Sequence, residues 1–242
     1  MRLMHFLHRI FVSFSVTRGF KIVLILMIIA SASTSANAGE QTAEDKVLHM
    51  AQKMTSAFQK MEDYTCEVEQ IYHGEGIEDR LYRFKYYFKK GKKIRIDFSQ
   101  PYPGTTVLYS QDSNKATVIP FQIFPALRFH FSIKNPMVMT MAGQRIDQTD
   151  MGYFIDFLFQ NLKKVKQKDH QFQEDEESAT FLLWALDYIN GERVEKYKVI
   201  ISKKHWLPIF IERYDGEGNP KETIHVKDYT INTHLDDRLF NP

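Results

Sequence analysis

The sequence predicts an α+β fold that is mainly β: a half-open antiparallel β-barrel of about nine strands covered by a helical lid. Apolar and polar residues alternate through residues 79–109, as they do in strands that bury one face. Two turn sequences near the C-terminus predict β-hairpins, and two other stretches carry apolar residues at helical spacing. Many antiparallel strands with few helices favour a curved sheet that stays open where the helices pack.

Residues 79–109 contain three of the predicted strands, and the rest of the chain is organised around them. Gly91 and the PYPG sequence at 101–104 supply the reversals between these strands. One face should be apolar and the other solvated and basic. The apolar face is expected to carry Tyr82, Phe84, Tyr86, Phe88, Ile94, Ile96 and Phe98. What covers this face is therefore the functional question.

Residues 1–38 have the composition of a cleaved secretory signal peptide. Four basic residues precede an apolar run at 22–30 that is too short to span a bilayer comfortably. Ala36 and Ala38 form an A-x-A cleavage site, so we expect a mature protein that begins at Gly39. The mature chain, residues 39–242, is expected to form a single domain. An uncleaved membrane anchor is the alternative.

The charge balance argues against a nucleic-acid partner. The chain has 32 basic and 30 acidic residues, and the signal segment holds four of the basic residues and no acidic one. The mature chain therefore has slightly more acidic than basic residues. Cys66 is the single cysteine, which excludes an internal disulfide.

The first predicted elements are an amphipathic helix at residues 43–61 and a strand at 64–72, and a turn at 73–76 leads into the central strands. A further strand is expected at 115–119. A second helix should be capped by Thr149 or Asp150 and run to about Lys164. The lysines at positions 163, 164, 166 and 168 suit the negative end of its dipole, and a docking role for them is the alternative.

The C-terminal part of the chain returns to strands. Residues 181–188 should pair with 193–202 across Asn190-Gly191. Residues 207–214 should pair with 222–231 across a glycine-rich turn at 215–220. The acidic residues 174–177 are expected to form a solvated loop.

Residues 121–141 are strongly apolar but lack a clean period. They include five phenylalanine and leucine side chains, then Met137, Met139 and Met141. One interpretation is an irregular segment buried in the core. The other is a mobile flap over the apolar face of the sheet, where flexible methionine and broad phenylalanine surfaces suit varied ligands.

The sequence offers no recognisable catalytic or metal-binding constellation. It contains no G-x-S-x-G, P-loop or H-E-x-x-H motif, and its histidines are scattered without ligand-like pairing. Cys66 lies on the apolar side of its strand and is expected to be buried and inert. We therefore expect no catalytic residue, no metal and no cofactor.

Three segments carry a resemblance to a known family. Residues 88–101 (FKKGKKIRIDFSQP) resemble the strand–turn–strand signature of periplasmic lipoprotein carriers of the LolA/LolB type. Two further segments are similar to the corresponding parts of these carriers: residues 206–218 (WLPIFIERYDGEG) and the C-terminal residues 229–232 and 239–242. Within this superfamily the sequence most resembles the uncharacterised DUF1571 proteins.

The resemblance implies a half-open barrel with a helical lid around an apolar cavity that receives lipid chains. Lys90 matches a basic residue that the carriers hold before the turn, where the LolA carrier has arginine. Lys90 is therefore the expected polar contact. A lipid or an acylated protein is the expected ligand, and an inner-membrane donor or outer-membrane acceptor is the kind of partner implied.

The leading hypothesis is a non-enzymatic, monomeric binder or carrier of lipid-like ligands in the periplasm of a Gram-negative-type bacterium. The sheet side of its cavity would be the apolar face from Tyr82 to Phe98 described above. The lid side would consist of Phe121, Phe124, Phe129, Phe131, Met137, Met139, Phe154 and Leu158. One alternative is a regulatory or sensor domain that binds a partner protein through the same face. Another is an envelope enzyme whose site the sequence does not reveal.

Overall fold

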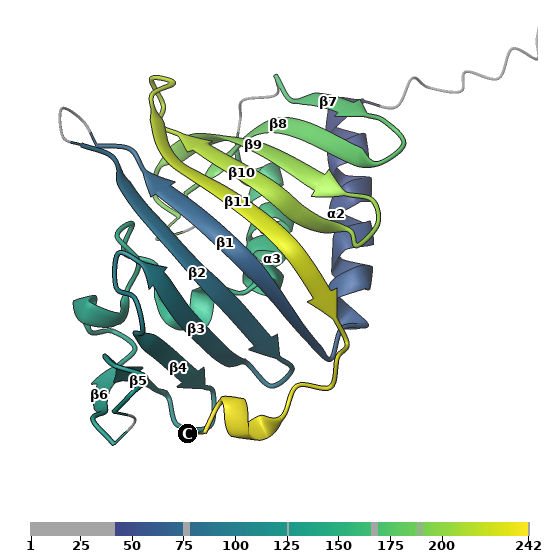
Figure 1. Ribbon diagram of the computed structural model, residues 1–242. Helices are drawn as coiled ribbons and strands as arrows, with labels where there is room; N and C mark the ends of the chain where they lie inside the picture. Colours follow the sequence, from purple (N-terminus) through teal and green to yellow (C-terminus); the bar gives the residue numbers. More distant parts are fainter. Residues whose placement is uncertain are drawn as a thin grey trace, which may run out of the picture. The chain divides into compact units, whose positions relative to one another are not determined.

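The structure, a computed structural model, describes residues 42–74, 78–124, 126–165, 169–187, 189 and 191–241. Its centre is an antiparallel sheet of eleven strands in the order β6-β5-β4-β3-β2-β1-β11-β10-β9-β8-β7 (Figure 1). The strands β6 and β7 are the two edges and are not paired with each other, so the sheet does not close. The predicted half-open antiparallel architecture is confirmed, with eleven strands where about nine were expected.

The strands follow one another as two meanders. The first consists of β1 (Asp63–Tyr72), β2 (Arg80–Lys89), β3 (Lys93–Gln100), β4 (Thr106–Ser110), β5 (Lys115–Ile119) and β6 (Phe129–Ser132). The second consists of β7 (Gln171–Glu174), β8 (Ser178–Leu186), β9 (Val194–Ser202), β10 (Leu207–Tyr214) and β11 (Pro220–Ile231). The pairing of β1 with β11 joins the two meanders into one sheet, which Figure 1 shows as a blue strand beside a yellow one.

Two α-helices begin at capping side chains. The helix α2 (Ala43–Gln59) starts with a capping box, in which Thr42 Oγ1 accepts from Asp45 N at 3.1 Å and Asp45 Oδ2 accepts from Thr42 N at 3.2 Å. The helix α3 (Met151–Asn161) starts at Asp150, whose Oδ1 accepts from Tyr153 N at 3.0 Å. Asp150 is thus the N-cap rather than Thr149. The described ranges also contain four 3-10 turns: η1 (Pro136–Val138), η2 (Ile146–Gln148), η3 (Leu162–Lys164) and η4 (Asp237–Leu239).

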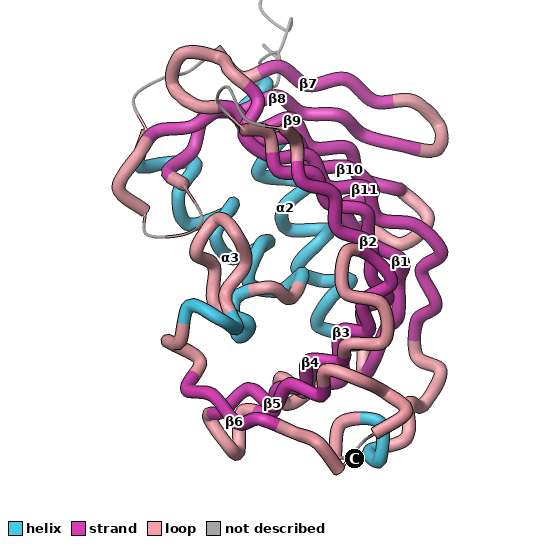
Figure 2. Tube along the Cα trace, turned by 60° about the vertical axis from the view of Figure 1, so that its left-hand side comes forward, coloured by secondary structure: helices cyan, strands magenta, loops and turns pink. Residues whose placement is uncertain are grey.

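Both helices lie on the inner face of the curved sheet, as the turned view in Figure 2 shows. Two apolar clusters hold them there. One packs α2 and α3 against β8–β10, and its most buried members include Met54, Ile155 and Phe181. The other is centred on β1–β4, where it includes Tyr64, Phe88 and Ile94, and it extends to β5, β10, β11 and the segment before α3. Phe58, near the end of α2, packs against both clusters and so connects them.

The two unexpected strands are the edge strands. Both have only four residues, and β7 (QFQE) is largely polar, so neither carries a strong strand pattern. Because β7 ends at Glu174, the loop expected at 174–177 begins one residue later. Short edges are a common way to limit pairing with other chains.

Several expectations fall outside the described residues. These are the signal segment at 1–38 and Gly39, positions 75 and 76 of the first turn, Lys166 and Lys168, Tyr188, and Asn190 of the hairpin turn. The single domain over residues 39–242 also stays a prediction. No helix in the described ranges is long and apolar enough to cross a membrane.

The segment 121–141 is not a buried irregular piece of core. Phe121, Ile123 and Phe124 are 54%, 80% and 62% exposed. After them the chain forms β6 and then η1, whose N-cap Asn135 accepts from Met137 N at 2.9 Å. The expectation of an irregular buried core segment is therefore wrong for this part of the chain, because most of its large side chains face outward.

A glycine determines how closely the two helices approach. A β-carbon added at Gly152 would lie 2.4 Å from Phe58 Cε1 and 2.9 Å from Asp150 Oδ1. We expect Gly152→Ala to lower the free energy of unfolding by about 1–3 kcal/mol, because either the Phe58 ring or the start of α3 must move. Gly216→Ala is the control, since its nearest neighbour would be Val194 O at 3.7 Å. Denaturant unfolding of the two variants measures the difference, and equal stability would contradict the close approach.

Candidate functional site

The inner face of the sheet carries ordered rows of side chains, because directly paired residues of neighbouring strands point to the same side. The first row runs across five strands and consists of Cys66, Tyr86, Ile96, Val107 and Val118. The second row consists of Val226, Val68, Phe84 and Phe98. The third row consists of Ile211, Ile224, Gln70 and Tyr82. Every residue of these three rows lines one cavity.

The same face is covered by helix at its other end. There the row formed by Tyr64, Phe88, Ile94, Tyr109 and Ala116 is buried. Phe58 of α2 lies on it, with its ring centroid 5.4 Å from that of Phe88. The predicted apolar face is therefore divided: α2 fills one end, and the other end is the floor of the cavity.

The opposite wall is the segment from Pro136 to Phe154, called the lid below. Hydrogen bonds hold its turns in place. Thr140 N donates to Gln144 O at 2.9 Å, and Gln144 N donates to Thr140 Oγ1 at 3.0 Å. Arg145 donates to both oxygens of Asp147 at 2.9 Å, which raises the pKa of its guanidinium. The lid is thus a structured wall rather than an unpaired loop.

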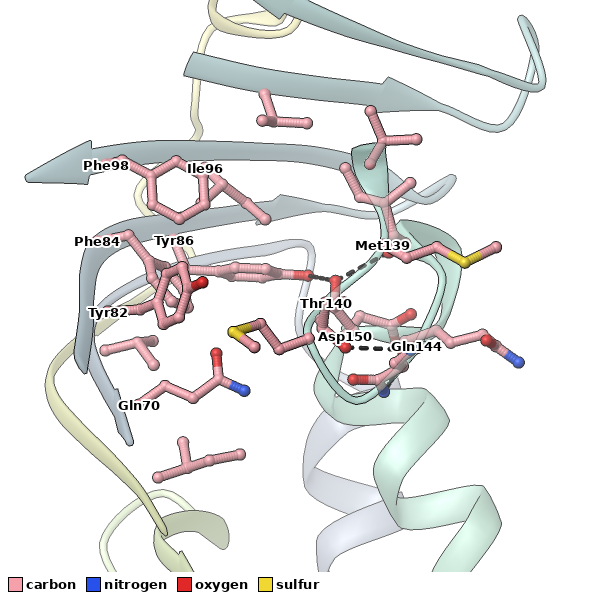
Figure 3. Close-up of a pocket in the computed structure, with 18 of the residues that line it drawn as sticks. Gln70, Tyr82, Phe84, Tyr86, Ile96, Phe98, Met139, Thr140, Gln144 and Asp150 are labelled. Carbon is pink, nitrogen blue, oxygen red and sulfur yellow. Dashed lines mark hydrogen bonds between the residues drawn. The ribbon is translucent and has the colours of Figure 1, made fainter. Parts of the chain in front are cut away.

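The cavity between floor and lid has a volume of about 410 Å³. Figure 3 shows Phe84, Tyr86, Ile96 and Phe98 on the sheet side, facing Met139 and the lid. Of the described residues that line it, Asp150 alone has a charged side chain. Tyr102, Met137 and Met141 also line the cavity and are 56%, 77% and 47% exposed, so they stand at its opening. The volume lies within the range of about 300–1,000 Å³ that is typical of small-molecule sites.

Hydrogen bonds to two buried tyrosines attach the lid to the inner face of the sheet. Tyr86 Oη lies 3.2 Å from Thr149 Oγ1, which itself donates to Ile146 O at 2.8 Å. Tyr64 Oη accepts from Met151 N at 3.3 Å. Burial raises the pKa of both phenols well above the ordinary value, so both remain neutral donors and acceptors.

Asp150 is buried at the junction of lid and helix, with 3% of its surface exposed. One carboxyl oxygen caps α3, while the other is buried without a hydrogen-bond partner. Burial raises the pKa of the Asp150 carboxyl, and the lowering effects of the Tyr153 N–H and the Lys92 ammonium are smaller. The folded protein therefore favours the protonated form of this side chain more than the unfolded chain does.

A buried polar network continues the inner face of the sheet beyond the floor. Gln70 Nε2 donates to Tyr72 Oη at 2.7 Å and to Glu222 Oε1 at 2.6 Å. Arg213 then bridges Glu222, at 3.2 Å, and Glu195, at 2.9 Å. The amide of Gln70 at the cavity wall is thereby directed towards the protein, which leaves the floor largely apolar.

The structure brings together eight of the expected site residues. Tyr82, Phe84, Tyr86, Ile96, Phe98, Met137, Met139 and Phe154 line the cavity. Phe88, Ile94 and Leu158 lie in the buried clusters instead, and Phe131 packs against one of them. Phe121, Phe124 and Phe129 are exposed and do not line it. Lys90 also lies elsewhere, since its ammonium pairs with Glu62 at 2.9 Å on the surface.

Sequence reasoning missed the polar part of the site. Gln70 and Tyr72 extend the alternation of β1, so the strand period could have found them. Gln144, Gln148 and Thr149 come from turns, for which no period exists. Neither the floor nor the lid holds a recognisable set of reacting groups, and no cluster of metal-ligating side chains occurs among the described residues.

Comparisons with known proteins give structural neighbours only. No family model matches the chain, and no curated protein matches it, so membership of the DUF1571 proteins stays a prediction. Solved structures of low sequence identity are similar over most of the chain.

One is a domain from Vibrio parahaemolyticus provisionally described as an outer membrane lipoprotein-sorting protein, with 17% identity, a TM-score of 0.44, and coverage of 82% of this chain and 97% of that one. A LolA superfamily protein from Nitrosomonas europaea has 11% identity, a TM-score of 0.38, and coverage of 78% and 96%. The lipoprotein LppX from Mycobacterium tuberculosis has 9% identity, a TM-score of 0.44, and coverage of 79% and 97%.

The raised pKa of Asp150 predicts a specific pH dependence of stability. Such a carboxyl contributes its full stability below the unfolded pKa of about 3.9, and the contribution is lost as the pH rises through the higher folded pKa. The free energy of unfolding of the wild type should therefore fall relative to that of Asp150→Asn, which keeps a capping side chain, between acidic and neutral pH. Chemical unfolding at matched pH values measures this difference. Parallel pH profiles would mean that the carboxyl does not change its pKa on folding.

Proposed function

We propose that this protein binds and carries lipid-like ligands by enclosing an acyl chain in the cavity between the sheet and the lid. The observation that carries the proposal is the floor: three cross-strand rows of mainly apolar side chains that α2 leaves uncovered, under a lid that ends in the first turn of α3. A cavity of about 410 Å³ with one charged side chain in its wall suits a hydrocarbon better than a polar substrate.

The energetics suit a carrier. Burying an acyl chain releases about 0.8 kcal/mol per methylene, so ten methylenes supply roughly 8 kcal/mol before ordering costs. The net binding free energy that is left after the ordering costs is small enough for the ligand to be released again, as a carrier requires. A head group would stay at the opening, beside Met137 and Tyr102.

The proposal includes export and a non-enzymatic role. The segment at 1–38 would direct the chain across the inner membrane and be removed before Gly39, and the mature protein would then act in the periplasm. The finer expectation, transfer of acylated proteins between a donor and an acceptor, is part of the same proposal. Support for a binding role comes from the mainly apolar floor and from the exposed apolar residues at the opening of the cavity.

The deciding experiment is native mass spectrometry of protein produced from the full chain, exported to a bacterial periplasm and purified without detergent. Solvent extraction of the same sample would identify a bound molecule. We expect a stoichiometric lipid or acylated adduct, together with the mass of a chain that begins at Gly39. An apo mass, with no uptake of added phospholipid or lipopeptide, would overturn the proposal. A stable protein complex without lipid would favour the regulatory alternative.

A charge inside the cavity should prevent binding. Phe98 and Ser99 are neighbours on β3, but Phe98 lines the cavity and Ser99 is exposed. We expect Phe98→Asp to weaken uptake of a fluorescent fatty acid at least roughly tenfold, because ligand binding would bury its carboxylate. Ser99→Asp adds the same charge outside the cavity and should bind like the wild type. Fluorescence titration measures both, and equal affinities would exclude this cavity as the acyl site.

A further inference from the structure

The strongly exposed large apolar side chains are concentrated in one part of the chain. Among the described residues, all eight of them lie between Tyr102 and Met141. Ile123 and Met137 are 80% and 77% exposed. Single exposed apolar residues are ordinary, but such a concentration is typical of an interaction surface.

Hydrogen bonds hold two of the contributing loops together. Gln122 N donates to Gly104 O at 2.9 Å, and Thr105 Oγ1 donates to Pro120 O at 3.1 Å. The loop that carries Tyr102 therefore lies beside the loop that follows β5. Tyr102 and Met137 belong to this surface and also line the cavity, so the surface reaches the cavity opening. We call Tyr102, Phe121, Ile123, Phe124, Leu127 and Met137 the apolar rim.

The charge has one sign along the part of the sequence that carries five of the six rim residues. Residues 113–146 contain Lys115, Arg128, Lys134 and Arg145 but no aspartate or glutamate. Arg128 and Lys134 are exposed and lie on the stretch that carries the rim and its continuation, and Arg145 forms an ion pair with Asp147 within the lid. Exposed phenylalanine, isoleucine and leucine with neighbouring cations match the interface of an anionic bilayer, where apolar side chains enter the acyl boundary and cations meet the head groups.

We infer that the apolar rim is a docking surface for anionic lipid bilayers, which places the cavity opening at the membrane. The surface follows from exposure and charge alone, whereas its use for loading or unloading an acyl chain rests on the proposed function. A bilayer fits better than a folded partner, because Phe121, Ile123 and Phe124 are exposed on the chain between β5 and β6 and suit the acyl boundary, while the neighbouring cations suit its head groups. With the opening at the membrane, an acyl chain can enter the cavity without crossing water.

Vesicle flotation of the protein produced from the full chain tests the inference. The vesicles are phosphatidylglycerol with phosphatidylethanolamine, compared with phosphatidylcholine alone. We expect binding to the anionic vesicles that weakens as salt is added, because exposed charges are screened. Ile123→Asp and Phe124→Asp should each reduce the partition coefficient at least roughly tenfold. Gln173→Asp, an exposed position on the edge strand β7, adds the same charge and should have no effect.

The outcomes separate this inference from the proposed function. Ile123→Asp should keep its thermal stability and its uptake of the fluorescent fatty acid, while Phe98→Asp should lose uptake but still float with vesicles. Wild-type protein that does not float, or rim variants that float like the wild type, would overturn the docking surface. Concentration-dependent self-association that Ile123→Asp abolishes, without vesicle binding, would overturn it in favour of a contact between two copies.

Discussion

The pairing of β1 with β11 is the constraint on which the rest of the structure depends. Each meander can form from neighbouring segments of the chain, but this ladder joins residues more than 140 positions apart. Buried Asp63 reinforces it, since its two carboxyl oxygens accept from Thr233 N at 2.8 Å and Leu235 N at 3.0 Å. The same ladder sets Gln70 beside Ile224 and Val68 beside Val226, so it also aligns the rows that form the cavity floor.

The elements with a strong period could be predicted from sequence, and those at the sheet edges could not. Strand alternation located β1–β5 and β8–β11, and apolar spacing with a capping residue located both helices. The strands β6 and β7 are four residues long, too short for a period to stand out. The alternation Phe129, His130, Phe131 was a usable signal for β6, but the surrounding apolar residues obscured it.

The candidate site could be predicted only in part. The sequence pattern tells which face of the sheet a side chain occupies, but not which part of that face a helix covers. Alternation told which side Phe84, Phe88 and Phe98 occupy, but not that α2 ends at Gln59 and covers Phe88 alone among them. The exposure of Phe121 and Phe124, which were expected on the lid side of the cavity, could not be predicted either, because phenylalanine is also a typical core residue. Only tertiary packing separates a phenylalanine in a cavity from one on a surface.

The distribution of polar groups limits what the cavity can recognise. Hydrogen bonds inside the protein already engage the Gln70 amide and the Tyr86 and Thr149 hydroxyls, so a ligand gains little from displacing them. Recognition inside would then depend on the length and shape of a hydrocarbon chain rather than on a head group. If the cavity holds an acyl chain as proposed, chemical selectivity would come from the opening, where the lid and the apolar rim share Met137. A carrier built in this way would accept several ligands that share an acyl chain and would distinguish them by what remains outside.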